Sequence, residues 1–171
     1  MSFGKSGAKI YAKDQTGTTF ADVAGQRDVE TVFAIINGNL DDYFSPDVIN
    51  FFMMQWPGGQ FIAEDIFGNP LGAICGSRLD GGRAAISLFA VSSMYRNRGV
   101  GTQLLEYFRR RCMMDGYPTI QLEVRTTNTN AIRFYERHGF VRTEHLPHFY
   151  NDGGDGYRMV SGTPGISLTS F

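Results

Sequence analysis

The residues from Ala84 to Val91 form a nearly uninterrupted apolar run, which constrains the fold more than any other part of the sequence. A strand with one solvated face alternates apolar and polar side chains, whereas a strand covered on both faces is apolar throughout. A turn signal, Asp80-Gly81-Gly82, comes shortly before the run. We therefore expect a central sheet strand that other elements cover on both faces.

The rest of the chain alternates between helix-like and strand-like patterns. Apolar residues spaced three and four apart predict helices over Asp28–Ile36, from near Gly99 to Gly116 and over Asn130–His138. Ser45-Pro46, an N-cap residue followed by a first-turn proline, predicts a further helix from Pro46 to about Gln55. The other predicted strands are Phe20–Val23, Phe61–Glu64, Leu71–Ser77, Thr119–Arg125, Phe140–Leu146 and Tyr157–Val160. This order contains both hairpins and helical crossovers, so it predicts an α/β (α+β) fold.

The chain has the length of one domain. It contains 171 residues, and domains usually run to about 100–200 residues. Both ends are rich in small and polar residues and lack a hydrophobic period. We therefore expect flexible tails at 1–18 and 162–171, on either side of a domain that spans 19–161.

Charge and composition exclude several classes of function. The formal net charge is −1, from 16 Lys and Arg against 17 Asp and Glu, whereas a general nucleic-acid binder carries a surplus of positive charge. No apolar run reaches the roughly 18 residues that cross a bilayer, and Met1–Lys13 lacks the apolar segment of a secretory signal. We expect a cytoplasmic protein that binds neither nucleic acid nor membrane.

The cysteines and histidines do not indicate a disulfide or a metal site. Cys75 and Cys112 lie in apolar patterns, which favours two reduced thiols in the core. His138, His145 and His148 have no carboxylate pattern beside them, and no Cys/His cluster has zinc spacing. We therefore expect no bound metal.

A glycine-rich segment follows the central strand and leads into a helix. Glycines let backbone N–H groups approach a ligand closely, and a helix N-terminus adds partial positive charge. The segment is not a Walker loop, because no GK[ST] follows, and the pattern G-x-G-x-x-G fails at Leu104. On local sequence alone, a pyrophosphate site and a plain glycine-rich helix entry are equally good interpretations. The segment consists of Arg96, Asn97, Arg98, Gly99, Val100, Gly101 and Thr102.

A second group of residues carries acid–base chemistry. Side chains alternate faces along a strand, so Glu123 lies on the face opposite the apolar Leu122 and Val124. Tyr135 lies on the apolar stripe of the next helix. These residues are either an acid–base pair or an exposed strand glutamate and a core tyrosine.

Together the two segments resemble the GNAT superfamily of acetyl-CoA-dependent N-acetyltransferases. The pattern R-x-x-G-x-G begins at Arg96, and N-x-x-A-x-x-x-Y-E-x-x-G-F runs from Asn128 to Phe140. The resemblance extends from about Thr19 to Val160. It implies a mixed, mostly antiparallel sheet that is splayed at its centre, about four flanking helices, and acetyl-CoA bound in the cleft without a metal.

The resemblance also implies a set of cofactor contacts. Backbone groups of Phe89, Ala90 and Val91 are expected to hold the pantetheine arm and the thioester carbonyl. Amides and side chains of the segment from Arg96 to Thr102 are expected to hold the pyrophosphate. Asn128 is expected to contact the pantetheine arm.

A narrower resemblance concerns the reacting groups. The run Leu122-Glu123-Val124-Arg125, followed by Tyr135, looks like the bacterial enzymes that acetylate the N-terminal alanine of a ribosomal protein. In that family the matching glutamate is the general base and the matching tyrosine is the general acid. The resemblance therefore implies these roles for Glu123 and Tyr135, with Tyr135 also beside the cofactor.

Three further runs are similar to the catalytic subunits of eukaryotic and archaeal protein N-terminal acetyltransferases: Trp56-Pro57, Phe61–Asp65 and Phe149–Tyr157. In those subunits a tyrosine pair of the last hairpin lines the peptide groove, and one of the two is a phenylalanine here. Asp42 falls where that family has a glutamate near the incoming α-amine. The residues expected to contact the acceptor are Asp42, Tyr43, Phe44, Phe149 and Tyr150.

The resulting hypothesis is a protein N-terminal acetyltransferase that acts on a protein or peptide N-terminus, with a ribosome or nascent chain as a further candidate partner. One alternative is a GNAT enzyme for a small-molecule amine or a lysine side chain, and the tyrosine-bearing hairpin argues against it. Another alternative is a non-catalytic acetyl-CoA-binding module. The presence of both Glu123 and Tyr135 argues against that module.

Overall fold

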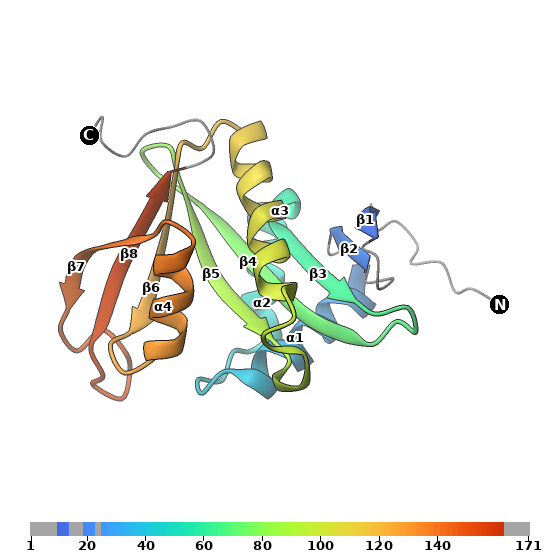
Figure 1. The fold of residues 1–171 in the computed structure, drawn as a ribbon, viewed down its shortest axis with the longest axis horizontal. Helices are drawn as coiled ribbons and strands as arrows, with labels where there is room; N and C mark the ends of the chain where they lie inside the picture. Colours follow the sequence, from blue (N-terminus) through green and yellow to red (C-terminus); the bar gives the residue numbers. More distant parts are fainter. Residues whose placement is uncertain (1–9, 14–18, 23–24, 163–171) are drawn as a thin grey trace.

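The apolar run forms β5 (Arg83–Val91), the fifth strand of an eight-stranded sheet in the computed structural model (Figure 1). The structure describes residues 10–13, 19–22 and 25–162. Its helices are α1 (Gly25–Asn39), α2 (Pro46–Gln55), α3 (Val100–Met114) and α4 (Thr129–Arg137), with short 3-10 turns η1 (Pro57–Gly59) and η2 (Ser93–Tyr95). The other strands are β1 (Ile10–Lys13), β2 (Thr19–Asp22), β3 (Gln60–Glu64), β4 (Pro70–Leu79), β6 (Thr119–Arg125), β7 (Val141–Leu146) and β8 (Gly156–Gly162).

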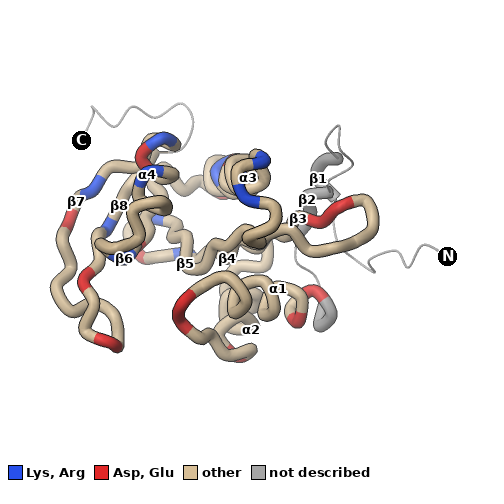
Figure 2. Tube along the Cα trace, turned by 60° about the horizontal axis from the view of Figure 1, so that its bottom comes forward, with Lys and Arg blue, Asp and Glu red and all other residues tan. Residues whose placement is uncertain are grey.

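The sheet is mixed and mostly antiparallel. Its strand order is β1-β2-β3-β4-β5-β6-β8-β7, and among these neighbours only β5 and β6 are parallel. Helices α1 and α2 cover one face of the sheet, and α3 and α4 cover the other (Figure 2). The predicted α/β fold, with a mostly antiparallel sheet and four flanking helices, is confirmed.

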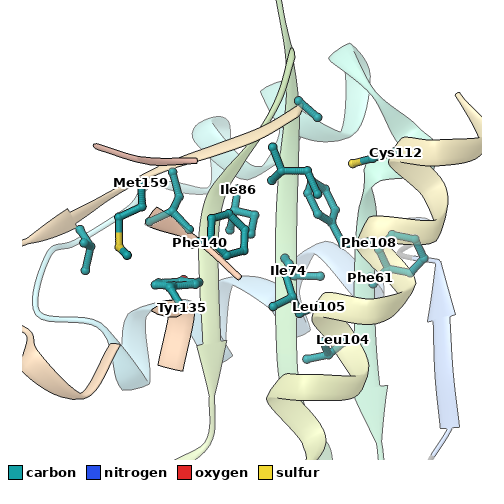
Figure 3. Close-up of a cluster of buried hydrophobic side chains, with 14 of the residues drawn as sticks. Phe61, Ile74, Ile86, Leu104, Leu105, Phe108, Cys112, Tyr135, Phe140 and Met159 are labelled. Atoms are coloured by element: carbon teal, nitrogen blue, oxygen red, sulfur yellow. The ribbon is translucent and has the colours of Figure 1, made fainter. Parts of the chain in front are cut away.

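The sheet separates two hydrophobic cores, which explains why β5 is apolar on both faces. The core under α3 and α4 is the larger (Figure 3). It includes Phe61, Leu105, Phe108 and Tyr135. The core under α1 and α2 contains ten buried side chains, and Ile36 is one of them. Gly76 permits close packing of α3, because a Cβ there would lie 2.3 Å from a ring carbon of Phe108.

Strands β5 and β6 separate along their length, and this opening positions the site. They pair only from Arg83 to Ile86 on β5, and beyond that point they diverge (Figure 1). A β-bulge lies at the same place, because Cys75 faces Leu88 while the next residue of β4 faces Ile86. The bulge leaves an extra residue, Ser87, on β5. Bulges bend a strand and increase its twist, so this one accounts for the divergence.

Local signals fix the ends of the helices that border the opening. Asn128 caps α4, because its Oδ1 accepts a hydrogen bond from Ala131 N at 3.2 Å. Gly116, just past α3, has φ +82°, the left-handed conformation that glycine adopts at helix C-termini. Pro46 is the first residue of α2, where its missing N–H is not needed.

One strand falls where the sequence predicts a tail. The segment Ile10–Lys13 forms β1 at the sheet edge, paired with β2. A short edge strand lacks a hydrophobic period of its own, so pairing rather than pattern defines it. The remaining tail residues, 1–9, 14–18 and 163–171, lie outside the described residues.

Among the described residues, no helix is long and apolar enough to cross a membrane.

Candidate active site

The opening between β5 and β6 contains a cleft with two connected parts. The wide chamber, of about 760 Å³, lies between the end of β5, the start of α3 and the first turns of α4. The narrow chamber, of about 210 Å³, lies deeper between β5 and β6 and reaches the α1–α2 loop and Tyr150. Phe89, Asn128 and Tyr135 line both chambers.

The end of β5 directs backbone groups toward the cleft. Ser92 N–H donates to Leu71 O on β4 at 2.8 Å. Because successive residues of a strand direct their backbone groups to opposite sides, the amides of Val91 and Phe89 face the opening instead. Arg96 Nε donates to Val91 O at 3.3 Å from that open side. The backbone of β5 is therefore accessible where the sequence predicts thioester and pantetheine contacts.

The segment before α3 contains two left-handed residues. Asn97 has φ 62° and Gly99 has φ 81°, and Gly99 directly precedes the helix. Left-handed residues next to right-handed ones turn successive N–H groups toward one point, which creates an anion-binding nest. Of the seven predicted residues, five line the wide chamber: Arg96, Asn97, Gly99, Gly101 and Thr102. Val100 is buried in the core instead, and Arg98 lies over the Tyr95 ring, 5.7 Å from its centroid.

Thr102 is linked to α4 through His138. Thr102 Oγ1 lies 3.0 Å from His138 Nε2, and His138 Nδ1 lies 2.7 Å from Phe134 O. A carbonyl oxygen only accepts, so Nδ1 carries the proton toward Phe134. In the neutral ring, Nε2 then accepts the hydroxyl proton of Thr102. This arrangement holds the hydroxyl at the edge of the wide chamber.

The two chambers carry opposite charge. Arg96, Arg125, Arg133 and Arg137 line the wide chamber, and Asp41 is its one acidic residue. The narrow chamber is lined by Asp41, Asp42 and Glu123, and Arg125 is its one basic residue. The wide chamber therefore suits an anion, and the narrow chamber suits a cation.

Glu123 lies on the polar side of β6, as its alternation with buried neighbours predicts. Its Oε1 accepts hydrogen bonds from Gln121 Nε2 at 2.9 Å and from Arg158 Nε at 3.2 Å. Arg158 also pairs with Glu144 on β7. Within the described part of the chain, Oε2 of Glu123 accepts no hydrogen bond. One oxygen is thus fixed, and the other is available to a ligand in the narrow chamber.

Tyr135 is buried, and its ring packs 5.5 Å from Phe140 and 6.4 Å from Phe89, between centroids. Burial raises the pKa of its phenol above the ordinary value, and the nearby Tyr150 adds to this shift. The hydroxyl therefore remains protonated at neutral pH. Glu123 and Tyr135, predicted as a pair from separate elements, both line the narrow chamber.

Arg125 has no predicted role, yet it makes more polar contacts at the cleft than the predicted residues do. Its Nη2 donates to both carboxylate oxygens of Asp42, at 2.9 and 3.1 Å. Its Nη1 donates to both oxygens of Asp152, at 3.1 and 3.0 Å. Its Cζ lies 4.1 Å from the centroid of the Tyr150 ring. One feature of the sequence could have indicated Arg125. It ends the predicted strand Thr119–Arg125, shortly before the predicted cofactor contact Asn128.

The predicted acceptor residues divide into two groups. Asp42, Phe44 and Tyr150 line the narrow chamber. Tyr43 and Phe149 do not line either chamber. Tyr43 is 72% exposed and packs edge-on against Phe33, and Phe149 packs edge-on against Tyr150. The structure therefore brings Tyr150 and Asp42 together through Arg125 and leaves two predicted aromatic residues outside.

The cysteines are inert side chains of the core. Cys75 and Cys112 are free and buried, which confirms the prediction of reduced thiols. Burial raises the pKa of each thiol to about 12, so neither is a nucleophile at neutral pH. The described residues contain no group of three or more His, Cys, Asp or Glu that could hold a metal ion.

Comparison with known sequences agrees with this geometry. Residues 29–140 match the sequence profile of the acetyltransferase (GNAT) family. N-alpha-acetyltransferase 30 of Schizosaccharomyces pombe is 30% identical over 135 residues, which are 77% of this chain and 90% of the relative.

Comparison with solved structures identifies the same fold. Ard1 from Thermoplasma volcanium superimposes with a TM-score of 0.80 and 34% identity, over 85% of this chain and 97% of that one. A chain of the NatC complex bound to Gag peptide and CoA superimposes with a TM-score of 0.79 and 24% identity. That match covers 85% of this chain and 98% of the other, and it concerns the fold alone.

Proposed function

Because this chain belongs to the acetyltransferase (GNAT) family, an acetyl-CoA-dependent class of transferases, we propose that it acetylates the α-amino group of a protein N-terminus. The observation that carries the proposal is the reversal of charge along one cleft. A basic chamber meets an acidic chamber at Tyr135 and Asn128, and both residues line both parts. Such a cleft accommodates an anionic acyl donor at one end and a cationic amine at the other.

The residues of the wide chamber fit acetyl-CoA. The turn around Asn97 and Gly99, with Arg96 beside it and a helix N-terminus after it, suits the negative charge of a pyrophosphate. Asn128 uses Oδ1 to cap α4, which leaves its amide N–H groups for an amide carbonyl of the pantetheine arm. Bound acetyl-CoA supplies the acetyl group as a reactive thioester.

The amide of Val91 is the candidate donor to the acyl oxygen. It faces the opening rather than β4, and β5 is held rigidly in the sheet by its pairing with β4. A fixed N–H aimed at an oxygen that gains negative charge stabilises the transition state. Removal of one such donor typically costs about 100- to 1,000-fold in kcat.

The acceptor must reach the site as a neutral amine. An α-amine has a pKa near 7.7–8.0 and a lysine amine near 10.4, a difference of about 2.5 units or roughly 3.4 kcal/mol. At neutral pH about a tenth of an α-amine is already neutral. A single carboxylate such as Glu123 then suffices as a base, because the remaining proton is weakly held.

In this proposal Glu123 and Tyr135 move protons at opposite sides of the reacting carbon. Oε1 of Glu123 is held by Gln121 and Arg158, so Oε2 accepts the proton of the incoming ammonium, directly or through one water. The Tyr135 hydroxyl, kept protonated by burial, donates to the departing thiolate. Neither buried cysteine is needed, because the amine attacks the acetyl group directly.

A panel of acceptors read by intact mass tests the proposal. The panel contains free peptides that begin with Ser, Ala, Met-Leu and Glu, an N-blocked peptide with one internal lysine, and spermidine. With acetyl-CoA, we expect a mass increase of one acetyl group only on peptides with a free α-amine. Heat-unfolded protein controls for spontaneous acetylation.

Two outcomes would contradict the proposal. Acetylation of spermidine or of the blocked peptide, with no acetylation of free α-amines, would assign the enzyme to small-molecule or lysine acceptors. Binding of acetyl-CoA without turnover on any member of the panel would favour a non-catalytic module.

A further inference from the structure

Arg125 joins three segments that border the narrow chamber. Asp42 belongs to the loop between α1 and α2, 83 residues before Arg125 in the sequence. Asp152 and Tyr150 belong to the turn between β7 and β8, and Asp152 is 27 residues after Arg125. Arg125 itself ends β6. One side chain therefore connects the two loops across the end of the strand that carries Glu123.

The geometry of this connection depends on the guanidinium group. Each terminal nitrogen donates to both oxygens of a different carboxylate, with all four distances between 2.9 and 3.1 Å. The flat face of the same group lies over Tyr150. Charge-assisted hydrogen bonds are short and strong. The planar guanidinium holds two donor nitrogens at a fixed separation while its face stacks on a ring, and the single ammonium of lysine cannot reproduce that arrangement.

The clamp places one positive charge between two negative ones. The two carboxylates raise the pKa of Arg125, and the pKa of Asp152 lies below its ordinary value because of Gly154 N–H and Arg125. Arg125 and Asp152 are thus charged at neutral pH. Arg125 engages Asp42 and Asp152, whereas Glu123 pairs through Oε1 with Arg158. Among the described residues, Oε2 of Glu123 accepts no hydrogen bond and is the acidic oxygen that an incoming cation can reach in the narrow chamber.

We propose that Arg125 is a positioning residue for the acceptor, which it serves by clamping the α1–α2 loop and the β7–β8 turn at the mouth of the narrow chamber. The clamp sets the distance between Tyr150 and Phe44 across the entrance and directs the incoming amine toward Glu123. This inference rests on the proposed function, because it assumes that the acceptor enters through the narrow chamber.

The clamp variants are Arg125→Lys, Asp42→Asn and Asp152→Asn, with steady-state kinetics on an N-terminal peptide and calorimetric binding of acetyl-CoA. For Arg125→Lys we expect the peptide KM to rise about 10-fold while kcat falls less than 3-fold. We expect the Kd for acetyl-CoA to change less than 3-fold. The triple variant should be no worse than Arg125→Lys, because the three residues act as one unit.

Arg142→Lys is the matched control. Arg142 also pairs with a carboxylate, Glu136, at 2.9 Å and lies 4.8 Å from the ring centroid of Tyr157, but it lines neither chamber. Its replacement should leave the peptide KM unchanged. A rise of the same size in both lysine variants would assign Arg125 a general structural role and overturn the proposal.

Hydrogen exchange gives a second readout that does not depend on turnover. In Arg125→Lys, amides of residues 40–44 and 149–155 should both exchange faster, although nothing but the clamp was altered. Unchanged exchange in both loops together with an unchanged peptide KM would overturn the clamp while the proposed function stands. Failure of the wild-type enzyme to acetylate any α-amine would instead remove the proposed function itself.

Discussion

The wide and narrow chambers of this cleft are built in different ways. The wide chamber offers backbone groups at the end of β5 and in the turn before α3, two segments that are close in the sequence. The narrow chamber offers charged side chains of β6 and the α1–α2 loop, which Arg125 links to the β7–β8 turn. Backbone-built sites tolerate side-chain changes, whereas side-chain networks fail when one member is replaced. The donor half is therefore expected to be robust and the acceptor half sensitive.

The largest effect should come from Glu123→Gln, which removes the base of the acceptor half. General acid–base catalysis contributes typically 100- to 10,000-fold, so we expect kcat to fall by about 100-fold or more. Acetyl-CoA should bind as before in calorimetry, because Glu123 lines only the narrow chamber.

Glu144→Gln is the control for this variant. Glu144 shares the partner Arg158 but lines neither chamber. Equal losses of kcat in both variants would mean that the salt-bridge network, and not the base, limits the rate.

The second effect tests whether the donor half depends on backbone conformation. Gly99 has φ 81°, and a side chain in the left-handed region costs about 1–2 kcal/mol. In Gly99→Ala we expect the nest to relax and the Kd for acetyl-CoA, measured by calorimetry, to rise about 10-fold. The peptide KM should change little.

Gly116→Ala is the matched control, because Gly116 has φ 82° at the other end of the same helix and a Cβ there meets open space. Both variants should lose similar thermal stability. If Gly116→Ala also weakened acetyl-CoA binding, strain in α3 rather than the nest would be responsible.

A smaller effect should follow from Thr102→Val, which removes the hydroxyl that is held by His138. One hydrogen bond contributes about 1 kcal/mol, so we expect acetyl-CoA to bind about 5-fold more weakly. Thr102→Ser keeps the hydroxyl and should bind like wild type. Equal binding by all three proteins would show that this hydroxyl does not contact the donor.

Low pH should destabilise the turn between β7 and β8, which borders the narrow chamber. The pKa of Asp155 is lowered by hydrogen bonds from His148 N–H and the His145 side chain, and that of Asp152 by Gly154 N–H and Arg125. An Asp carboxyl has a pKa near 3.9 in the unfolded chain. When its pKa is lower in the folded protein, the group stabilises the fold at pH values above about 3.9. This stabilisation is lost as the pH falls through the folded-state pKa. Amide protection in 148–155 should persist at pH 5 and decline below about pH 4.

The control for this acid effect is Asp152→Asn, which lacks one of the two titrating groups and should show a smaller change with pH. Protection that declined above pH 5 in the wild type would contradict the direction of these shifts.

The smallest effect should be that of thiol reagents. With a pKa of about 12 for both Cys75 and Cys112, only about one thiol in 10,000 is ionised at pH 8. Alkylation by iodoacetamide should be slow while the protein is folded, and activity should persist. Rapid alkylation with loss of activity would place a reactive thiol near the cleft.

The sequence was sufficient for the parts of the site that are local in the chain. The apolar run of β5 and the segment from Arg96 to Thr102 are adjacent, so their pattern predicts both the strand and the turn beside it. Alternation along β6 correctly places Glu123 opposite the buried face. Five of the seven residues of the glycine-rich segment line the wide chamber.

The remaining parts depend on contacts between distant segments. The clamp joins Arg125 to Asp42, 83 residues away, and a pattern along one chain does not record such a pair. The partner of Glu123, Arg158, is defined by the pairing of β6 with β8. Whether Tyr43 faces the cleft depends on the course of a loop, and the structure directs it outward. Register and loop course therefore limit what the sequence predicts about the acceptor half.

The most direct test of the central claim is calorimetric binding of a conjugate that occupies both chambers at once. The conjugate joins CoA through an acetyl bridge to the α-amine of a short peptide, and its control is joined through a lysine side chain of an N-blocked peptide. Because linkage makes the second binding event intramolecular, we expect the α-linked conjugate to bind at least about 100-fold more tightly than CoA. The lysine-linked control should bind like CoA alone. Equal affinity of the α-linked conjugate and CoA would contradict an acceptor site in the narrow chamber.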